Sequence, residues 1–238
     1  MSVPSRPVVR EIVDPADPAI AKGYRLLRRV FPKAELVSCV EWRHSLRERQ
    51  GKLWTDLRWH LVIAEAAGRV IGVVTGSYLG NVNTGVIGYL AVARSARRLG
   101  VGPKLRARLR TLFERDARQI LRRPLQAVVG EVRRDNPWLR TLIRAKRVLA
   151  LDFPYFQPQL RRGDGPVPLV FYYESCDRSR RRLSATMIRR LLYTIWRRLY
   201  RIARPLSDPA FRQNLQGLSN RRSVGEIKLK VLAAPPAH

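Results

Sequence analysis

The sequence predicts an α+β protein in which a mixed, mostly antiparallel sheet is flanked by helices. Three strand-like runs at residues 61–66, 70–78 and 86–92 follow one another with short, glycine-containing connections, as in an antiparallel meander. Amphipathic helical segments precede and follow these runs. A chain of 238 residues is long enough for one sizeable core plus an appendage.

The N-terminal part contributes one strand and two helices. A short β-branched run at residues 8–13 predicts the first strand. After a proline- and aspartate-rich turn, residues 19–31 have helical spacing, and Pro32 ends that segment. A second helix is expected over residues 38–50, where Gly51 closes it.

Helices and strands alternate after the meander. A basic amphipathic helix is expected over residues 103–118, followed by a strand at 125–132. The next helix covers residues 138–148, because Asn and Pro before it form a typical helix start. A proline-punctuated extended segment at 153–160 leads to a final strand at 169–174.

Composition changes at residue 178. Residues 178–204 contain ten arginines and neither a lysine nor an acidic residue. At helical spacing, one face is apolar and the opposite face is arginine-rich, and Pro205 is expected to end the helix. We therefore expect a domain at residues 1–177 and a basic helical extension with a tail at 178–238.

Three roles for the extension are open. Its apolar face can pack on the body of the protein or on a second subunit, forming a homodimer. The cationic helix, which carries Trp196 and two tyrosines, can lie on an anionic membrane. It can also contact the phosphates of a nucleic acid or another polyanion.

The charge of the whole chain points to anionic partners. The sequence has 47 basic and 18 acidic residues, a formal net charge of +29, which favours attraction to polyanions. Cys39 and Cys176 fit no metal-ligand spacing, so no metal is expected. With no secretory signal pattern at the N-terminus and no membrane-spanning apolar run, a cytoplasmic location is expected.

A basic loop with two glycines lies between the third meander strand and the helix at 103–118. Strand, glycine-bearing turn and helix start are the order that directs backbone N–H groups and a helix dipole at a phosphate. A Walker loop needs Lys-Ser/Thr after the last glycine, whereas Pro103 and Lys104 follow here. A dinucleotide fingerprint needs a third glycine and parallel strands. A helix that starts after two glycines by chance is the plain alternative.

Two motifs carry a resemblance to a known family. Leu90, Val92, Arg97, Gly100, Gly102 and Leu105 form L-x-V-x-x-x-x-R-x-x-G-x-G-x-x-L. This pattern resembles the acyl-CoA pyrophosphate signature of the GNAT N-acetyltransferase superfamily. Residues 131–136, E-V-R-R-D-N, resemble the E-V-R-x-S-N segment of the ribosomal-protein N-terminal acetyltransferases. The resemblance covers about residues 8–175 and implies the GNAT-type sheet.

The resemblance implies an acyl-CoA-dependent N-acyltransferase that uses acetyl-CoA, or another acyl-CoA, as co-substrate. In the family, the acyl group passes directly to an amine. The backbone of Val92 and Arg94 would pair with the pantetheine amide. Asn136 matches a family residue that contacts CoA, although Asn before Pro is also an ordinary helix cap. The pyrophosphate would lie on the loop residues Arg97, Arg98, Leu99, Gly100, Val101 and Gly102.

The resemblance implies Glu131 as the general base, and Tyr155 is the candidate for the acid. Glu131 lies where the related enzymes carry their general base, and a glutamate that merely pairs with an arginine is the alternative. The family's general-acid tyrosine would fall at Ile143, so this sequence departs from the pattern there. Tyr155 is a substitute acid, unless it is a core residue.

The rival hypothesis is a binding module. A GNAT fold with reduced catalysis, marked by Ile143, could bind nucleic acid, an anionic membrane or a protein partner through its basic surface. For the enzyme, cationic surroundings favour a neutral or anionic acceptor over a strongly basic one.

Overall fold

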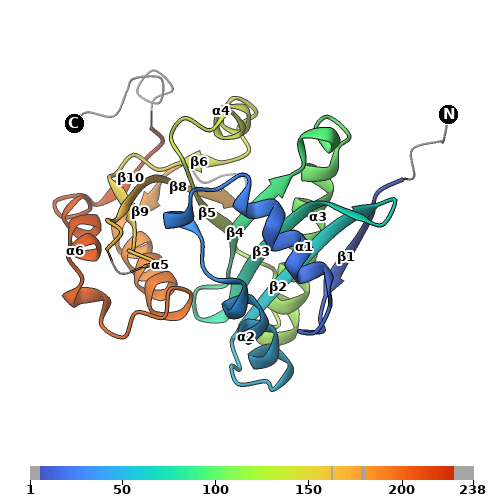
Figure 1. The fold of residues 1–238 in the computed structure, drawn as a ribbon. Coiled ribbons are helices and arrows are strands. Elements are labelled where there is room, and N and C mark those ends of the chain that lie inside the picture. The colour runs from blue at the N-terminus through green and yellow to red at the C-terminus, as the bar shows by residue number, and fades with distance from the viewer. Residues whose placement is uncertain (1–5, 162, 178–180, 228–238) are drawn as a thin grey trace. The chain divides into compact units, whose positions relative to one another are not determined.

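A computed structural model describes residues 6–161, 163–177 and 181–227 (Figure 1). Contacts group the chain into two compact units, Met1–Leu125 and Gln126–His238. The unit boundary thus falls at residue 125, inside the domain that composition assigns to residues 1–177. No helix among the described residues is both long enough and apolar enough to cross a membrane.

The first unit contains the predicted antiparallel meander. Its strands β1 (Val8–Ile12), β2 (Leu57–Ala66), β3 (Arg69–Leu79) and β4 (Thr84–Val92) pair in chain order, each antiparallel to the next. The turn between β2 and β3 consists of Ala67 and Gly68, both at positive φ (48° and 70°), which is the geometry of a tight two-residue hairpin. The expected mostly antiparallel sheet flanked by helices is confirmed.

Helices α1 (Ala19–Arg28) and α3 (Val101–Leu121) cover opposite faces of this sheet (Figure 1). Side chains alternate along β3, so Val73 faces Gly23 of α1, while Gly72 faces Leu105 of α3. Helix α2 (Cys39–Gln50) begins at a capping box in which Ser38 and Glu41 bond each other's backbone N–H.

A close approach between β3 and α3 depends on Gly76. A Cβ there would lie 2.7 Å from Phe113 Cζ, 2.9 Å from Leu109 Cδ2 and 2.6 Å from the carbonyl oxygen of Val86. Phe113 and Leu109 are both fully buried. The glycine therefore allows α3 to pack directly on the sheet.

The second unit is built around β8 (Val167–Ser175). This strand pairs antiparallel with β5 (Ala127–Val132), β6 (Leu149–Ala150) and β7 (Tyr155–Gln157), while helix α4 (Pro137–Arg144) follows β5. In the β5–β8 register, Glu131 lies opposite Phe171.

The C-terminal part packs within this second unit. It comprises helices α5 (Ala185–Arg198) and α6 (Pro209–Gln216), and the short hairpin of β9 (Leu183–Ser184) with β10 (Ser223–Val224). Short 3₁₀ turns are η1 (Lys33–Glu35), η2 (Gly80–Val82), η3 (Arg94–Ala96) and η4 (Pro205–Ser207). The apolar face of α5 is buried through Ile188, Leu191, Leu192, Ile195 and Trp196. The apolar face is thus covered by other parts of this chain, and Trp196 contacts Phe211 of α6.

The expected helix up to Pro205 is wrong at its end. Helix α5 stops at Arg198, and Arg201 adopts a left-handed φ of 58°. The N–H of Ile202 donates to the carbonyl oxygen of Trp196 at 3.1 Å, which closes the helix end. Leu199 and Ile202 therefore lie beyond the helix, and residues 178–180 of the predicted extension lie outside the described residues.

Candidate functional site

The glycine loop has the geometry of a helix start that faces outward. Strand β4 ends at Val92, η3 begins at Arg94, and Gly100 forms the N-cap of α3 with φ 70°. A Cβ on Gly100 would meet nothing within 4 Å. The glycine is therefore required by its left-handed backbone and not by a crowded neighbour.

The first N–H groups of α3 are suited to hold an anion. Among the described residues, no side chain caps this helix. Val101 and Gly102 precede the first helical hydrogen bond, which Lys104 N donates to the carbonyl oxygen of Gly100 at 3.3 Å. Pro103 has no N–H to leave unpaired. Together with the helix dipole, these groups can bind phosphate oxygens.

Cations surround this loop. Arg94, Arg97 and Arg98 are exposed, and Leu99 between them and Gly100 is 58% exposed. These side chains can reach a ligand held at the helix start. Their positive charge and the helix dipole act in the same direction on an approaching phosphate.

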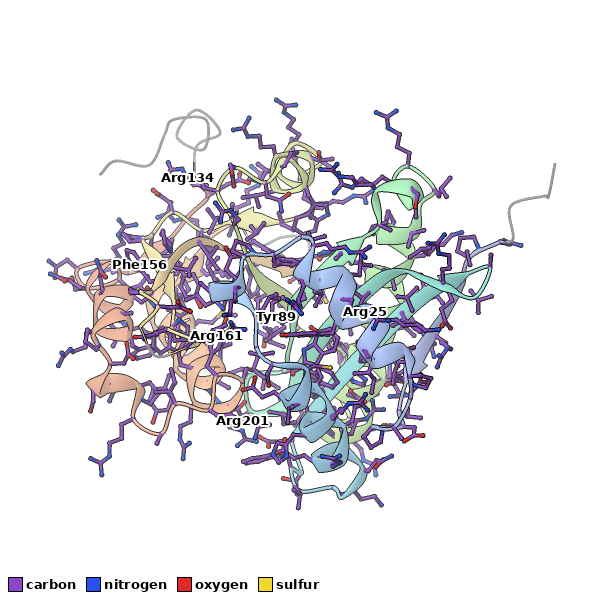
Figure 2. All side chains as sticks on the ribbon, in the orientation of Figure 1. Arg25, Tyr89, Arg134, Phe156, Arg161 and Arg201 are labelled. Atoms are coloured by element: carbon purple, nitrogen blue, oxygen red, sulfur yellow. The ribbon has the colours of Figure 1, made fainter. Side chains whose placement is uncertain are left out.

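A cationic cavity of about 360 Å³ opens beside η3 in the same unit. Four cations from α1, its C-cap and the start of β3 line it together with Ala93 and Ser95, and Arg25 among them is labelled in Figure 2. The acidic residues on neighbouring elements are engaged elsewhere, because Arg10 pairs with Asp17 at 2.7 Å and with Glu65 at 2.8 Å. The cavity cations are Lys22, Arg25, Arg29 and Arg69.

In the second unit, the Glu131 carboxylate is held by two tyrosine hydroxyls. Tyr155 donates to Oε1 and Tyr200 donates to Oε2, each at 2.5 Å. Burial raises the pKa of Glu131 to about 6, although both hydrogen bonds act in the opposite direction. A carboxylate with this pKa is mostly ionised at neutral pH and can still accept a proton.

The structure brings together the two catalytic residues that the sequence predicts. Tyr155 lies on β7 and is 2% exposed, so it is both a core residue and a partner of Glu131. Burial and the neighbouring carboxylate raise the pKa of Tyr155 well above its usual value. The phenol therefore keeps its proton at neutral pH.

Tyr200 is the member of this cluster that sequence reasoning missed as a site residue. It follows α5 and lies 69 residues from Glu131 in the chain. Its position depends on the early end of α5, which helical spacing did not predict. No local motif distinguishes it from the other tyrosines.

Two further predicted positions have clear structural roles. Asn136 is the N-cap of α4, where its side chain accepts from Trp138 N at 3.0 Å. Ile143 is 6% exposed and packs with Leu139 and Val148, so apolar packing fills the position of the family's tyrosine. Within the described residues, no group of three or more His, Cys, Asp or Glu side chains could hold a metal ion.

The comparisons with known proteins agree with this fold. Residues 22–128 match the model of the acetyltransferase (GNAT) family. A GNAT-family structure from Bacteroides thetaiotaomicron aligns with a TM-score of 0.58 at 16% identity, covering 82% of this chain and 99% of that one. Residues 22–128 thus form an acetyltransferase domain of the GNAT family, and the solved structure shows the same fold.

Two other solved structures show the same fold. An N-acetyltransferase from Staphylococcus aureus Mu50 has a TM-score of 0.51 at 15% identity, covering 72% of this chain and 99% of that one. A Salmonella typhimurium structure with its cofactor acetyl-CoA has a TM-score of 0.50 at 18% identity, covering 73% and 95%. Among curated proteins, none matches this sequence.

Proposed function

We propose that this GNAT protein transfers an acyl group from acyl-CoA, in the first place acetyl-CoA, directly to an amine, with Glu131 as the general base. The observation that carries the proposal is a half-buried carboxylate with a pKa of about 6, held by two tyrosine hydroxyls. When bound, acyl-CoA would supply the activated acyl group.

The loop supports acyl-CoA as the donor. The N–H groups of Val101 and Gly102 have no intrahelical acceptor, and open space lies in front of Gly100. The loop arginines and the cationic cavity add positive potential in the same unit. These residues fit a pyrophosphate, and Val92, Arg94 and Asn136 remain proposed contacts of the rest of the ligand.

Glu131 is suited to take a proton from an ammonium group. An amine attacks only after it has lost this proton, and a base near its optimum has a pKa close to the working pH. The proton would pass to a Glu131 oxygen, directly or through one water. Tyr155, which keeps its own proton, is the proposed donor to the departing thiolate in place of Ile143.

The donor site is tested with Gly100→Glu. A carboxylate at the helix start should repel the pyrophosphate, so calorimetry should show at least a roughly tenfold loss of acetyl-CoA affinity. Gly163→Glu is the matched control, because Gly163 also has a positive φ (91°) and open space around it. Unchanged affinity in folded Gly100→Glu would refute the loop as the donor site.

A second candidate function is a binding module for a polyanion, an anionic membrane or a protein partner. The buried Ile143 and the exposed cations favour it. Consumption of the acetyl-CoA thioester with a panel of neutral, anionic and basic amines separates the two functions. An inert protein whose affinity for a polyanion falls steeply with salt would be a binding module.

Other expectations remain part of the proposal. They are a cytoplasmic location, an acyltransferase domain at residues 1–177 and a neutral or anionic acceptor. Burial of the α5 apolar face in the single chain argues against a homodimer formed through that face. Chromatography with light scattering measures the oligomeric state.

A further inference from the structure

The arginine-rich C-terminal segment contacts the strands that carry Glu131 and Tyr155. By composition this segment is an appendage, but its side chains hydrogen-bond to both strand segments of the candidate acid–base pair. All of these contacts lie within the second unit.

The first contact is the hydroxyl of Tyr200 on Glu131. The chain turns at the end of α5, where the N–H of Tyr200 donates to the carbonyl oxygen of Ile195 at 3.2 Å and Arg201 is left-handed. The Tyr200 ring lies edge-on to Trp196, with ring centroids 6.4 Å apart. This packing directs the hydroxyl to Oε2 of Glu131 at 2.5 Å.

The second contact is an amide clamp on β7. Asn214 of α6 is fully buried, donates from Nδ2 to the carbonyl oxygen of Phe156 at 2.9 Å and accepts from Phe156 N at 2.7 Å. Phe156, which is labelled in Figure 2, directly follows Tyr155. Two hydrogen bonds from one side chain fix the strand that presents the Tyr155 hydroxyl.

We propose that the C-terminal segment is a working part of the acid–base apparatus, with Tyr200 as a positioning residue that orients the Glu131 carboxylate and Asn214 as the residue that holds Tyr155 against it. The inference rests on the proposed function of Glu131. It assigns the extension to the reaction centre and not to lipid or nucleic acid.

The two tyrosines also determine how readily Glu131 ionises. Within the second unit, the titratable groups facing the carboxylate are Tyr155 from β7 and Tyr200 after α5, and the residue opposite on β8 is Phe171. Hydrogen bonds to the ionised form stabilise that form. Loss of the Tyr200 hydroxyl should therefore raise the pKa of Glu131 further and leave less of the base ionised at neutral pH.

The test is Tyr200→Phe in the full chain, which retains the ring and removes only the hydroxyl. We expect the pKa of Glu131, followed by carbon-13 NMR of its carboxylate, to rise by about one unit. The acidic limb of the pH profile of kcat/KM should move upward by the same amount. Tyr193→Phe is the matched control, because Tyr193 lies on α5, is 41% exposed and contacts Phe211.

A second variant should shift the pKa of Glu131 in the opposite direction. Replacement of Tyr200 by 3-fluorotyrosine keeps the shape and makes the phenol a stronger donor, so the pKa of Glu131 should fall. An unchanged Glu131 pKa in both variants would overturn the inference. If the pKa moves but the pH profile of kcat/KM does not, Tyr200 orients the carboxylate and it is the base role of Glu131 that is refuted.

Discussion

Two carboxylates of this protein, one in each unit, are shifted in opposite directions. Glu11 of β1 accepts from His60 Nδ1 at 2.7 Å and from the Arg49 guanidinium, and these partners lower its pKa to about 2 against the effect of burial. Glu131 accepts from two neutral phenols, and burial raises its pKa to about 6. The charge of the hydrogen-bond donor, and not burial alone, decides whether the carboxylate stays ionised or can exchange a proton.

The first unit uses its charges for structure. His60 is fully buried between two carboxylates, with Nδ1 on Glu11 and Nε2 on Asp116 at 2.6 Å, and Arg49 lies 3.1 Å from Nδ1. Both ring nitrogens are thus engaged. This arrangement links β1, β2 and α3. In the Glu131 cluster, by contrast, the pKa of the carboxylate lies within about one unit of neutral pH.

The largest effect is expected for Glu131→Gln. If this carboxylate is the base, kcat should fall by about 10²–10⁴-fold while the affinity for acetyl-CoA is unchanged, since the amide cannot accept the proton. Steady-state kinetics and calorimetry measure the two quantities. Glu11→Gln is the informative counterpart, because it should lower stability and leave kcat per folded molecule unchanged. Wild-type turnover in Glu131→Gln would show that Glu131, like Glu11, has no catalytic role.

His60→Leu should destabilise the first unit by about 3–5 kcal/mol. The substitution removes the hydrogen-bond partner that Glu11 shares with the buried Asp116, and removing one partner of a buried carboxylate has a cost of this order. Urea unfolding followed by tryptophan fluorescence reports the change. His44, whose side chain is 54% exposed and pairs with Glu48, provides the control, since His44→Leu should change stability by less than about 1 kcal/mol.

Gly76→Ala should cost about 1–3 kcal/mol, because the new Cβ overlaps Phe113 and Leu109 of α3. On the opposite face of the sheet, a Cβ at Gly23 would lie 3.4 Å from Val73, so Gly23→Ala should be tolerated better. Thermal unfolding compares the two variants. Equal melting temperatures would show that α3 does not require a glycine beneath it.

The pH dependence of stability should separate the two carboxylates. The Glu11 contribution is complete above its ordinary pKa of 4.5 and should be lost as pH falls towards about 2. The contribution of Glu131 to stability has the opposite pH dependence. The cost of burying its ionised form is absent below pH 4.5 and grows as pH rises to about 6. Glu131→Gln should therefore stabilise the protein at pH 7 and not at pH 4. The same stability change at both pH values would argue against a raised Glu131 pKa.

Much of the fold follows from local patterns in the chain. The meander, the glycine loop and the helix that follows it depend on side-chain alternation, turn residues and helical spacing within short windows. The sequence suggests Tyr155 as a substitute acid, and the structure gives the reason for its position: β7 pairs with β8, which also pairs with β5, the strand of Glu131. That neighbourhood is a matter of strand pairing and not of sequence distance.

The end of α5 and the place of Tyr200 depend on long-range packing. Helical spacing continues to Ile202, so nothing local stops the helix at Arg198. The left-handed turn at Arg201 becomes favourable because the apolar face of α5 and the hydroxyl of Tyr200 find their partners elsewhere in the second unit. Residue types and short-range periodicity thus specify the helices, the strands and the glycine loop before α3. The surroundings of Glu131, and with them its pKa, arise when segments 24 and 69 residues away fold against it.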